Sequence, residues 1–249
     1  MDIERTSILL TKQNDILSRL DQLSKRLNNL TPSDEITKTQ QHVSDYAKSI
    51  DLKNELVRVP SPYYTWTLEQ RACYLDAPSP DHLCKSIIME NIDCVNSDMS
   101  DPFNSRYYLV IIQYTTKIQN QKVLKFVKSL GSQSRQSNQP LSKANYRFTL
   151  ATSEASHRMT GFEYNAVCPI ATIDRIPIIV SQAILSLKNQ VVWLGGGETD
   201  LKLVVDINEF IQKVQDNANN KVFVADVTYD TTSISASTPS DETTTTADS

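Results

Sequence analysis

Apolar residues near the start of the chain recur at the spacing of a coiled coil. Ile16, Leu20, Leu23, Leu27 and Leu30 are separated alternately by four and three residues, which places them along one side of an α-helix. Polar residues interrupt the series toward the N-terminus, so it spans only about two heptads, and an isolated coil of that length is marginal. The pattern predicts an amphipathic helix with short coiled-coil character.

A second helix is predicted directly after the first. Thr31-Pro32 ends the first helix, and Ser33-Asp34-Glu35 is typical of a new helix N-terminus. The second helix is expected to run to about Leu56, with apolar positions at Ile36, Val43, Ala47 and Ile50. Residues 1–58 are therefore predicted to form a helical hairpin or coiled coil. Either the hairpin folds on itself or on the rest of the chain, or it serves as a handle for a dimer or another partner.

Short apolar runs alternate with helical stretches beyond Pro60 and Pro62. The strand candidates are short and mostly rich in β-branched residues, and they lie at 85–89, 107–114, 146–151, 176–180, 191–194 and 201–205. Helices are predicted at 117–130, 153–159 and 208–214, and a further helix begins at the capping pair Thr67 and Gln70. This alternation predicts a mixed α/β (α+β) domain over residues 63–215.

The last segment has a different composition. From about Asp226 the chain is acidic, rich in Ser and Thr and nearly without aliphatic residues. Such a segment buries too little apolar surface to offset the entropy lost on ordering, so residues 226–249 are predicted to be disordered. The segment holds five acids and no Lys or Arg, whereas residues 1–225 hold 25 basic and 24 acidic residues. The net charge of −4 therefore does not exclude a basic patch on the body.

Composition excludes several classes of protein. No stretch approaches 18 consecutive apolar residues, and the N-terminus lacks the basic and apolar regions of a signal peptide. The four cysteines, Cys73, Cys84, Cys94 and Cys168, form no CxxC pair, and the chain has only three histidines. A zinc site is therefore not expected. We expect reduced thiols in a cytosolic or nuclear protein, with the cytoplasm as the predicted location, and we expect no cofactor and no membrane partner.

Glycine is scarce, with five residues in the chain, and three of them are consecutive at Gly195-Gly196-Gly197. The triplet follows the apolar run VVWL, so it marks a place where a positive φ or a close approach of a ligand or another main chain is needed. It fits neither GxGxxG nor a P-loop, because no GK[ST] follows and Glu198 would repel phosphate. Binding of a nucleoside triphosphate is not expected.

The loop from Gly161 to Ala171 has few polar residues for a loop. Pro169 restricts Cys168 to extended geometry. A loop constrained in this way can present main-chain N–H and C=O groups in a fixed array, which suits recognition of a small ligand by backbone.

Two possible nucleophiles have weak support. Cys84 could act as one only if a base were close, and His82 lies two residues away, where side chains need not meet. Ser153, Ser156 and His157 could form a serine triad, but no G-x-S-x-G elbow accompanies them, and helix capping explains the serines better.

Lys85 and a group of three later lysines can each be interpreted in two ways. Lys85, which leads into the apolar run SII, either reaches water from a strand end or serves as a cation in a cleft. The lysines at 122, 125 and 128 share one sector of a predicted helix. They form either a solvated face or a contact to RNA phosphates.

Four segments together resemble the YbaK / prolyl-tRNA-synthetase-associated editing domain family. They lie between Trp66 and Ile211 and read KSII from Lys85, LATSEASHRMTGFEYNAVCPIA, IPIIVSQAI and WLGGGETDLKLVVDINEFI. Each motif is weak alone, whereas the ordered set is specific, and the NAV and GGGE variants look like a eukaryotic branch. Bacterial members often have Gly where Asn165 and Ala171 stand, and asparagine tolerates the positive φ of such a turn.

The resemblance implies a YbaK-like fold, with a twisted, barrel-like mixed sheet and flanking helices, that hydrolyses the ester of a mischarged aminoacyl-tRNA without a metal. The amino acid would be small, such as alanine or cysteine, and tRNA(Pro) is a frequent tRNA. Lys85 matches the family lysine near the terminal adenosine and its phosphate, and is the expected catalytic residue. The remaining residues expected at the substrate are Gly161, Asn165, Ala166, Val167, Cys168, Pro169, Gly195, Gly196 and Gly197.

The expected partner is therefore mischarged tRNA. An aminoacyl-tRNA synthetase or a second copy of the chain could bind the N-terminal helices. The alternative function is a tRNA- or synthetase-binding adaptor that is catalytically inactive and docks through these helices.

Overall fold

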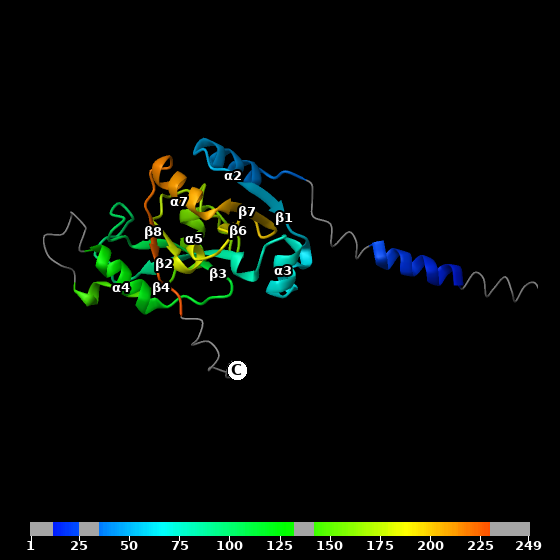
Figure 1. Ribbon diagram of the computed structural model, residues 1–249, viewed down its shortest axis with the longest axis horizontal. Coiled ribbons are helices and arrows are strands. Elements are labelled where there is room, and N and C mark those ends of the chain that lie inside the picture. The colour runs from blue at the N-terminus through cyan, green and yellow to red at the C-terminus, as the bar shows by residue number, and fades with distance from the viewer. Residues whose placement is uncertain (1–11, 25–34, 132–141, 230–249) are drawn as a thin grey trace, which may run out of the picture.

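The computed structural model describes residues 12–24, 35–131 and 142–229. Its body contains two β-sheets with helices packed around them (Figure 1). The mixed α/β class predicted from the sequence is confirmed. Within the described ranges the strands form two separate sheets that do not close into a barrel.

The larger sheet has five strands in the order β4-β2-β3-β5-β8. Their bounds are β2 Cys84–Asn91, β3 Tyr107–Gln113, β4 Phe148–Leu150, β5 Ile178–Ser181 and β8 Val222–Ala225. β2 pairs antiparallel with β3 and β4, whereas β3, β5 and β8 are parallel. β3 lies at the centre and is buried on both faces, which suits its nearly continuous apolar sequence YYLVIIQ.

The smaller sheet has three antiparallel strands in the order β1-β7-β6. Their bounds are β1 Glu55–Arg58, β6 Val191–Gly195 and β7 Leu201–Asp206. In this register Lys202 of β7 lies opposite Gly195 of β6 and Val57 of β1. Residues directly opposite each other in antiparallel strands share a face of the sheet, so Lys202 has a neighbour without a side chain.

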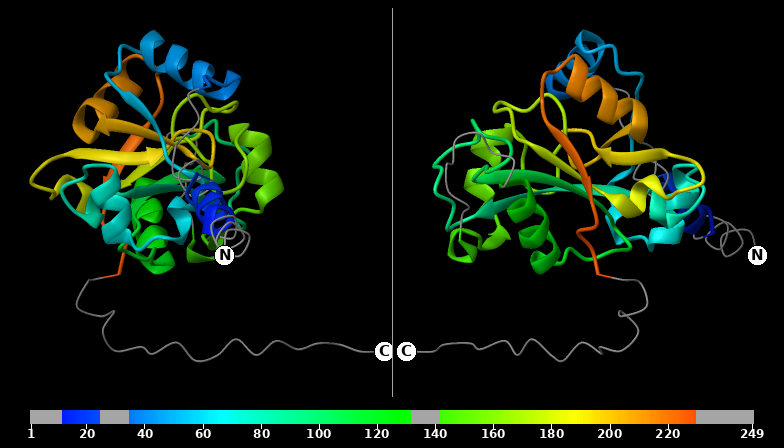
Figure 2. Two further views of the ribbon diagram at one scale, coloured as in Figure 1. Left: turned by 90° about the vertical axis from the view of Figure 1, so that its right-hand side faces the viewer. Right: turned by 60° about the vertical axis from the view of Figure 1, so that its left-hand side comes forward.

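The main core lies between the two sheets and two helices, α2 (Lys38–Ser49) and α7 (Ile207–Asp216). α2 begins at the N-cap Thr37 and buries Val43 and Ala47 in this core. α7 begins at the N-cap Asp206, whose side chain accepts from two backbone N–H groups. Figures 1 and 2 show both helices on the side of the larger sheet opposite to α4.

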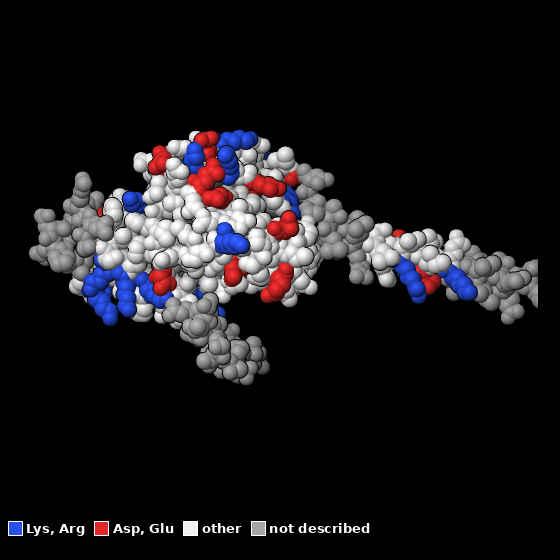
Figure 3. Space-filling view, viewed as in Figure 1, with Lys and Arg blue, Asp and Glu red and all other residues white. Residues whose placement is uncertain are grey.

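α4 (Asn120–Gly131) covers the other face of the larger sheet through Val123, Val127 and Leu130. Its lysines point away from that face. Lys122 is ion-paired with Asp226 at 2.8 Å, whereas Lys125 and Lys128 are exposed. In the view of Figure 3 basic residues gather over this part of the molecule. Both interpretations of these lysines remain predictions.

A third, aromatic cluster covers one end of the smaller sheet. It is built from the 3-10 helix η1 (Ser61–Thr65) and from α3 (Leu68–Tyr74). α3 begins with the predicted capping box of Thr67 and Gln70. The remaining short helices are η2 Pro80–His82, η3 Lys143–Asn145, α5 Ser153–Thr160 and α6 Gln182–Leu185.

The second predicted helix is shorter than expected. It ends at Ser49 and not at about Leu56, because the chain turns at Asp51, whose φ is +56°, and then forms β1. β1 was not predicted, and neither was β8. Both are four-residue strands held by partners distant in sequence, β7 and β5.

The two ends of the chain are described only in part. Residues 12–24 form a helix whose side chains are all exposed, including Ile16, Leu17, Leu20 and Leu23. The rest of the predicted apolar series and the hairpin turn fall in residues 25–34, outside the described ranges. The predicted disordered tail also lies mostly outside them, in residues 230–249. Its first residues are ordered, since Val227 and Thr228 are buried and Thr228 bridges to Ile118.

Candidate functional site

A cavity of about 360 Å³ lies at an edge of β2. β4 pairs only with Met89–Asn91, so the first half of β2 is uncovered by a strand on that side. The cavity occupies this place and is closed by α5, the loop after α5, β6 and β7. Its lining residues are Lys85, Ser86, Ile87, Ile88, Tyr114, Leu150, Ala151, Ser153, Ser156, Tyr164, Asn165, Val167, Gly195 and Lys202.

Four of the predicted site residues lie in the wall of this cavity, and they come from all three sequence motifs. They are Lys85, Asn165, Val167 and Gly195. The other six lie outside the lining: Gly161, Ala166, Cys168, Pro169, Gly196 and Gly197. Pro169 lines a different cavity, next to Tyr46.

The loop after α5 owes its course to three residues with positive φ. Gly161 ends α5 at φ 78°, Asn165 has φ 65° and Ala171 has φ 59°. Asparagine therefore holds the left-handed turn at 165, as predicted, whereas alanine at 171 adopts a conformation that β-carbons disfavour. Within the loop, the side chains of Ala166 and Cys168 are buried and act as packing residues.

The glycine triplet permits close approach of two main chains. A Cβ on Gly195 would lie 2.4 Å from the carbonyl oxygen of Val167. Gly196 closes the β6–β7 turn, since its N–H donates to the carbonyl of Leu201 at 2.9 Å. Gly197 has φ 100° and passes beside Thr39 and Phe162. Only the first glycine lines the cavity, while the other two shape the turn.

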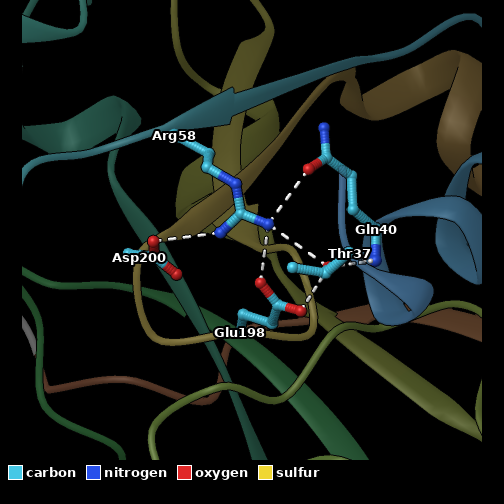
Figure 4. A network of polar contacts seen from close by, with 5 residues as sticks. All are labelled: Thr37, Gln40, Arg58, Glu198 and Asp200. Atoms are coloured by element: carbon cyan, nitrogen blue, oxygen red, sulfur yellow. Dashed lines mark hydrogen bonds and ion pairs between the residues drawn. The ribbon is translucent and has the colours of Figure 1, made fainter. Parts of the chain in front are cut away.

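An ion-pair network fixes the turn that follows the triplet (Figure 4). Arg58 of β1 binds Glu198 at 2.8 Å and Asp200 at 2.9 Å, and its side chain is only 9% exposed. Arg58 also donates to Thr37 and Gln40 at the start of α2. The glycine turn, β1 and the N-terminus of α2 are thereby joined by one guanidinium.

Burial alone would raise the pKa of Glu198, but hydrogen bonds from Thr37 and Arg58 outweigh it and hold the pKa below its ordinary value. Burial likewise opposes the charge of Arg58, and bonds to Glu198 and Asp200 outweigh that effect and raise its pKa. The network is therefore charged at neutral pH. A carboxylate with a depressed pKa stabilises the fold above its unfolded pKa, and this contribution is lost as the pH falls through the folded pKa.

Arg58→Met is expected to lower the free energy of unfolding by about 2 kcal/mol at neutral pH, less than for a fully buried pair because Asp200 is 44% exposed. The loss should shrink as the pH falls and Glu198 is protonated. Urea unfolding at neutral and acidic pH measures both effects. Arg147→Met, which removes the exposed pair with Asp93, is the control and should change little. An equal loss in both variants at neutral pH would contradict the role of the network.

The cavity contains a second lysine, Lys202, which was not predicted from the sequence. Its residue is 6% exposed, and burial, with the charge of Arg71, lowers the pKa of its amine to about 8. Burial also lowers the pKa of Lys85, whose Nζ lies 5.5 Å from the ring centre of Tyr114. Among the described lining residues there is no carboxylate. The cavity thus offers amines, hydroxyls and one amide, a set that suits an anionic or ester-bearing ligand.

The two buried thiols are poor nucleophiles in this fold. Cys84 and Cys168 are buried, and burial raises the pKa of Cys84 and brings that of Cys168 to about 12. His82 contacts Ser79 Oγ at 3.0 Å and the carbonyl of Asn189 at 2.8 Å through its two ring nitrogens. It therefore has no nitrogen left to activate Cys84.

An aromatic disulfide reagent should accordingly modify the exposed Cys73 in the native protein and reach Cys84 and Cys168 only after unfolding. Any ester hydrolysis by the protein should survive this treatment. Thiol release followed by absorbance, with activity measured in parallel, tests the expectation. Loss of activity in step with modification of Cys84 would instead make it the nucleophile.

The residues of the conceivable serine triad are separated by their contacts. Ser153 and Ser156 line the cavity from α5. His157 Nδ1 lies 3.1 Å from the carbonyl oxygen of Phe162 and 3.8 Å from Glu163. His157 is thus engaged by the loop after α5 and is not among the residues that line the cavity.

Residues 12–24, 35–131 and 142–229 contain no group of three His, Cys, Asp or Glu side chains placed to hold a metal ion. They also contain no helix with the length and apolar character needed to cross a bilayer.

Comparisons with known proteins identify the fold. No protein-family profile matches the sequence, and no curated protein matches it. A crystal structure of a candidate trans-editing enzyme for prolyl-tRNA synthetase superposes with a TM-score of 0.56 at 16% identity, covering 79% of this chain and 100% of the other. A scaffold from computational epitope grafting gives 0.55 at 15% identity, covering 78% and 99%. A hypothetical protein gives 0.53 at 19% identity, covering 76% and 99%.

Proposed function

We propose that this chain is an aminoacyl-tRNA deacylase that acts in trans. It hydrolyses the ester between a small amino acid, such as alanine or cysteine, and a tRNA, with tRNA(Pro) as the first candidate. The observation that carries the proposal is the cavity, where Lys85, Asn165 and Val167 of the loop, and Gly195 of the glycine triplet meet. The likeness in fold to a candidate editing enzyme agrees with it. The work of such an enzyme lies in the cytosol, with the translation machinery.

Hydrolysis of an aminoacyl ester needs only modest catalysis from the protein. Water adds to the ester carbonyl carbon, the bond from that carbon to the ribose oxygen breaks, and the tRNA leaves with a free hydroxyl. An aminoacyl ester is already activated, so positioning and stabilisation of the developing oxyanion suffice. We assign both tasks to main-chain N–H groups of the loop and to the charge of Lys85. Lys85 would hold the terminal phosphate or adenosine, and the loop would hold the aminoacyl group.

We expect the walls of the cavity to set the substrate specificity. At about 360 Å³ the cavity is near the lower end of ligand cavities. Gly195 and the loop backbone form one wall, and the apolar chains of Ile88, Leu150 and Ala151 form another part of the lining. In an editing site, a large side chain clashes with the pocket wall while a small one fits, which separates small residues from bulky ones.

The test is hydrolysis of a panel of charged tRNAs by the purified protein. Ala-tRNA(Pro) and Cys-tRNA(Pro) should be deacylated, and Pro-tRNA(Pro) or a tRNA charged with a bulky residue should be spared. Gel separation of charged and uncharged tRNA gives the rate. Failure to deacylate any member of a panel that spans the small amino acids would reject the proposal.

A second candidate is an adaptor that binds tRNA or a synthetase without catalysis. The helix at residues 12–24 favours it, because Ile16, Leu17, Leu20 and Leu23 are each more than half exposed. Such a face is suited to a partner helix or to a second copy of the chain. Light scattering and tRNA binding of the full chain and of a Leu20→Glu, Leu23→Glu variant test it. The adaptor gains support if the variant loses association or binding while no ester is hydrolysed.

A further inference from the structure

Lys202 is held in an unusual environment for a lysine. It is the second residue of β7, is 6% exposed and lines the cavity together with Lys85. Its Nζ donates a hydrogen bond to the Tyr64 hydroxyl and lies 4.6 Å from the Tyr64 ring centre and 5.3 Å from that of Tyr63. In the described part of the chain no carboxylate is ion-paired with it, and the nearby Asp200 is bound to Arg58 instead.

The surroundings of Lys202 are fixed by a second cation. Arg71 of α3 donates to the carbonyls of Trp66 at 3.0 Å and Tyr64 at 2.6 Å, and its guanidinium lies 5.2 Å from the Tyr64 ring centre. The hydroxyl of Tyr64 in turn faces that of Tyr114, which lines the cavity. The titratable or charged groups around Lys202 are Tyr63, Tyr64, Arg71, Lys85, Tyr114 and Asp200.

We propose that Lys202 is the general base of this cavity and takes the proton of the water that attacks the ester. The inference rests on the deacylase function proposed above and adds a residue that no sequence motif identified. A neutral amine keeps one lone pair, so it can donate to Tyr64 and still accept a proton on the side of the cavity. Gly195, its cross-strand neighbour, has no side chain, so the carbonyl of Val167 and not a side chain lies next to it at this wall of the cavity.

The step balances in protons and bonds. The amine of Lys202 takes one proton from water while the water oxygen bonds to the carbonyl carbon. When the bond to the ribose oxygen breaks, the resulting ammonium returns that proton to the ribose oxygen. The free amine is regenerated, and the products are the amino acid and the uncharged tRNA. Lys85 keeps a separate task, which is to hold the substrate anion.

The charges and burial around Lys202 keep part of its amine neutral near neutral pH. Burial and the positive charge of Arg71 both disfavour the ammonium form and outweigh the attraction of Asp200, which leaves the pKa at about 8. A general base is most effective when its pKa lies close to the working pH. Lys85, which is half-buried, has a smaller shift in the same direction, caused by burial alone.

Single-turnover hydrolysis as a function of pH tests the proposal, with spontaneous hydrolysis subtracted. The wild-type rate should rise with pH and level off above about pH 8. Lys202→Met should lower the rate by about 10²–10⁴-fold and remove the inflection. Lys202→Arg should be as slow, because a guanidinium keeps its charge and cannot accept the proton. If Lys202→Arg hydrolyses within a few fold of the wild-type rate, Lys202 is not the general base and only its charge matters.

Urea unfolding of the same proteins supplies a readout that needs no substrate. A lysine with a lowered folded pKa makes the fold more stable as the pH rises from the folded pKa to the unfolded one. Wild type should therefore gain stability relative to Lys202→Met above about pH 8. A difference in stability that stays constant with pH would contradict a lowered pKa for Lys202. If both lysine variants hydrolyse as wild type does, only this inference fails. If wild type hydrolyses no aminoacyl-tRNA, the deacylase function itself fails and the inference with it.

Discussion

Gly195→Ala is expected to lower the free energy of unfolding by about 1–3 kcal/mol, the usual range for overpacking, and to slow hydrolysis at least tenfold. The new Cβ would lie 2.4 Å from the Val167 carbonyl oxygen and 3.2 Å from its carbonyl carbon. Because the obstacle is main chain, the loop itself must shift, and Asn165 and Val167 in the cavity wall shift with it. Urea unfolding and single-turnover hydrolysis measure the two effects.

Gly131→Ala is the matched control. Its Cβ would also meet an atom at 2.4 Å, but that atom is the hydroxyl oxygen of Tyr146, at the end of a side chain. Neither glycine has a positive φ, so the two substitutions differ in what must move and not in backbone strain. The control should cost less stability, because a helical alanine is favoured over glycine, and it should leave hydrolysis unchanged. Equal effects of the two substitutions on hydrolysis would contradict the role given to the Gly195–Val167 contact.

Lys85→Ala is expected to reduce kcat/KM for deacylation by about 10²-fold, the effect of removing one positioned charge from a site with little water. The amine is half-buried beside the Tyr114 ring and lies in the cavity wall. Stability should change little or increase, because burial already disfavours its charge. Steady-state kinetics with tRNA at several concentrations separate the loss in kcat from the loss in affinity.

The exposed Lys188 provides the control for Lys85. Lys188→Ala removes the same charge from the surface between α6 and β6 and should leave kcat/KM unchanged. Lys85→Arg should restore part of the activity if the charge holds a phosphate, since a guanidinium binds phosphate well. A folded Lys85→Ala variant that deacylates at the wild-type rate would remove Lys85 from the site.

Local sequence patterns were sufficient for elements that carry their own signals. The capping box at Thr67 and Gln70 marks α3, and the apolar run at 107–114 marks the central strand β3. β1 and β8 lack such signals, because each is a four-residue strand defined by its partner: Glu55 pairs with Val204, and Ile178 with Val222. Pairing over such separations cannot be read from a window of neighbouring residues.

The candidate site likewise has one part that could be predicted from the sequence and one part that could not. The scarcity of glycine and the restriction of the loop by proline indicated two functional segments. The structure brings their backbones together at Gly195 and Val167. Lys202 was missed because a lysine in an alternating strand normally faces water. Its burial comes from η1 and α3, whose residues Tyr64 and Arg71 lie more than a hundred positions earlier in the chain. Such an environment arises only when the tertiary structure forms.

The cavity at the edge of β2 is expected to bind the aminoacyl end of tRNA. A non-hydrolysable analogue, in which an amide replaces the ester of alanyl-tRNA(Pro), tests this binding. At a concentration that fully blocks hydrolysis, the analogue should protect Lys85 from reductive methylation and leave Lys188 reactive, as measured by mass spectrometry of peptides. Methylation of Lys85 at an unchanged rate under the same block would place the reaction elsewhere and contradict the account.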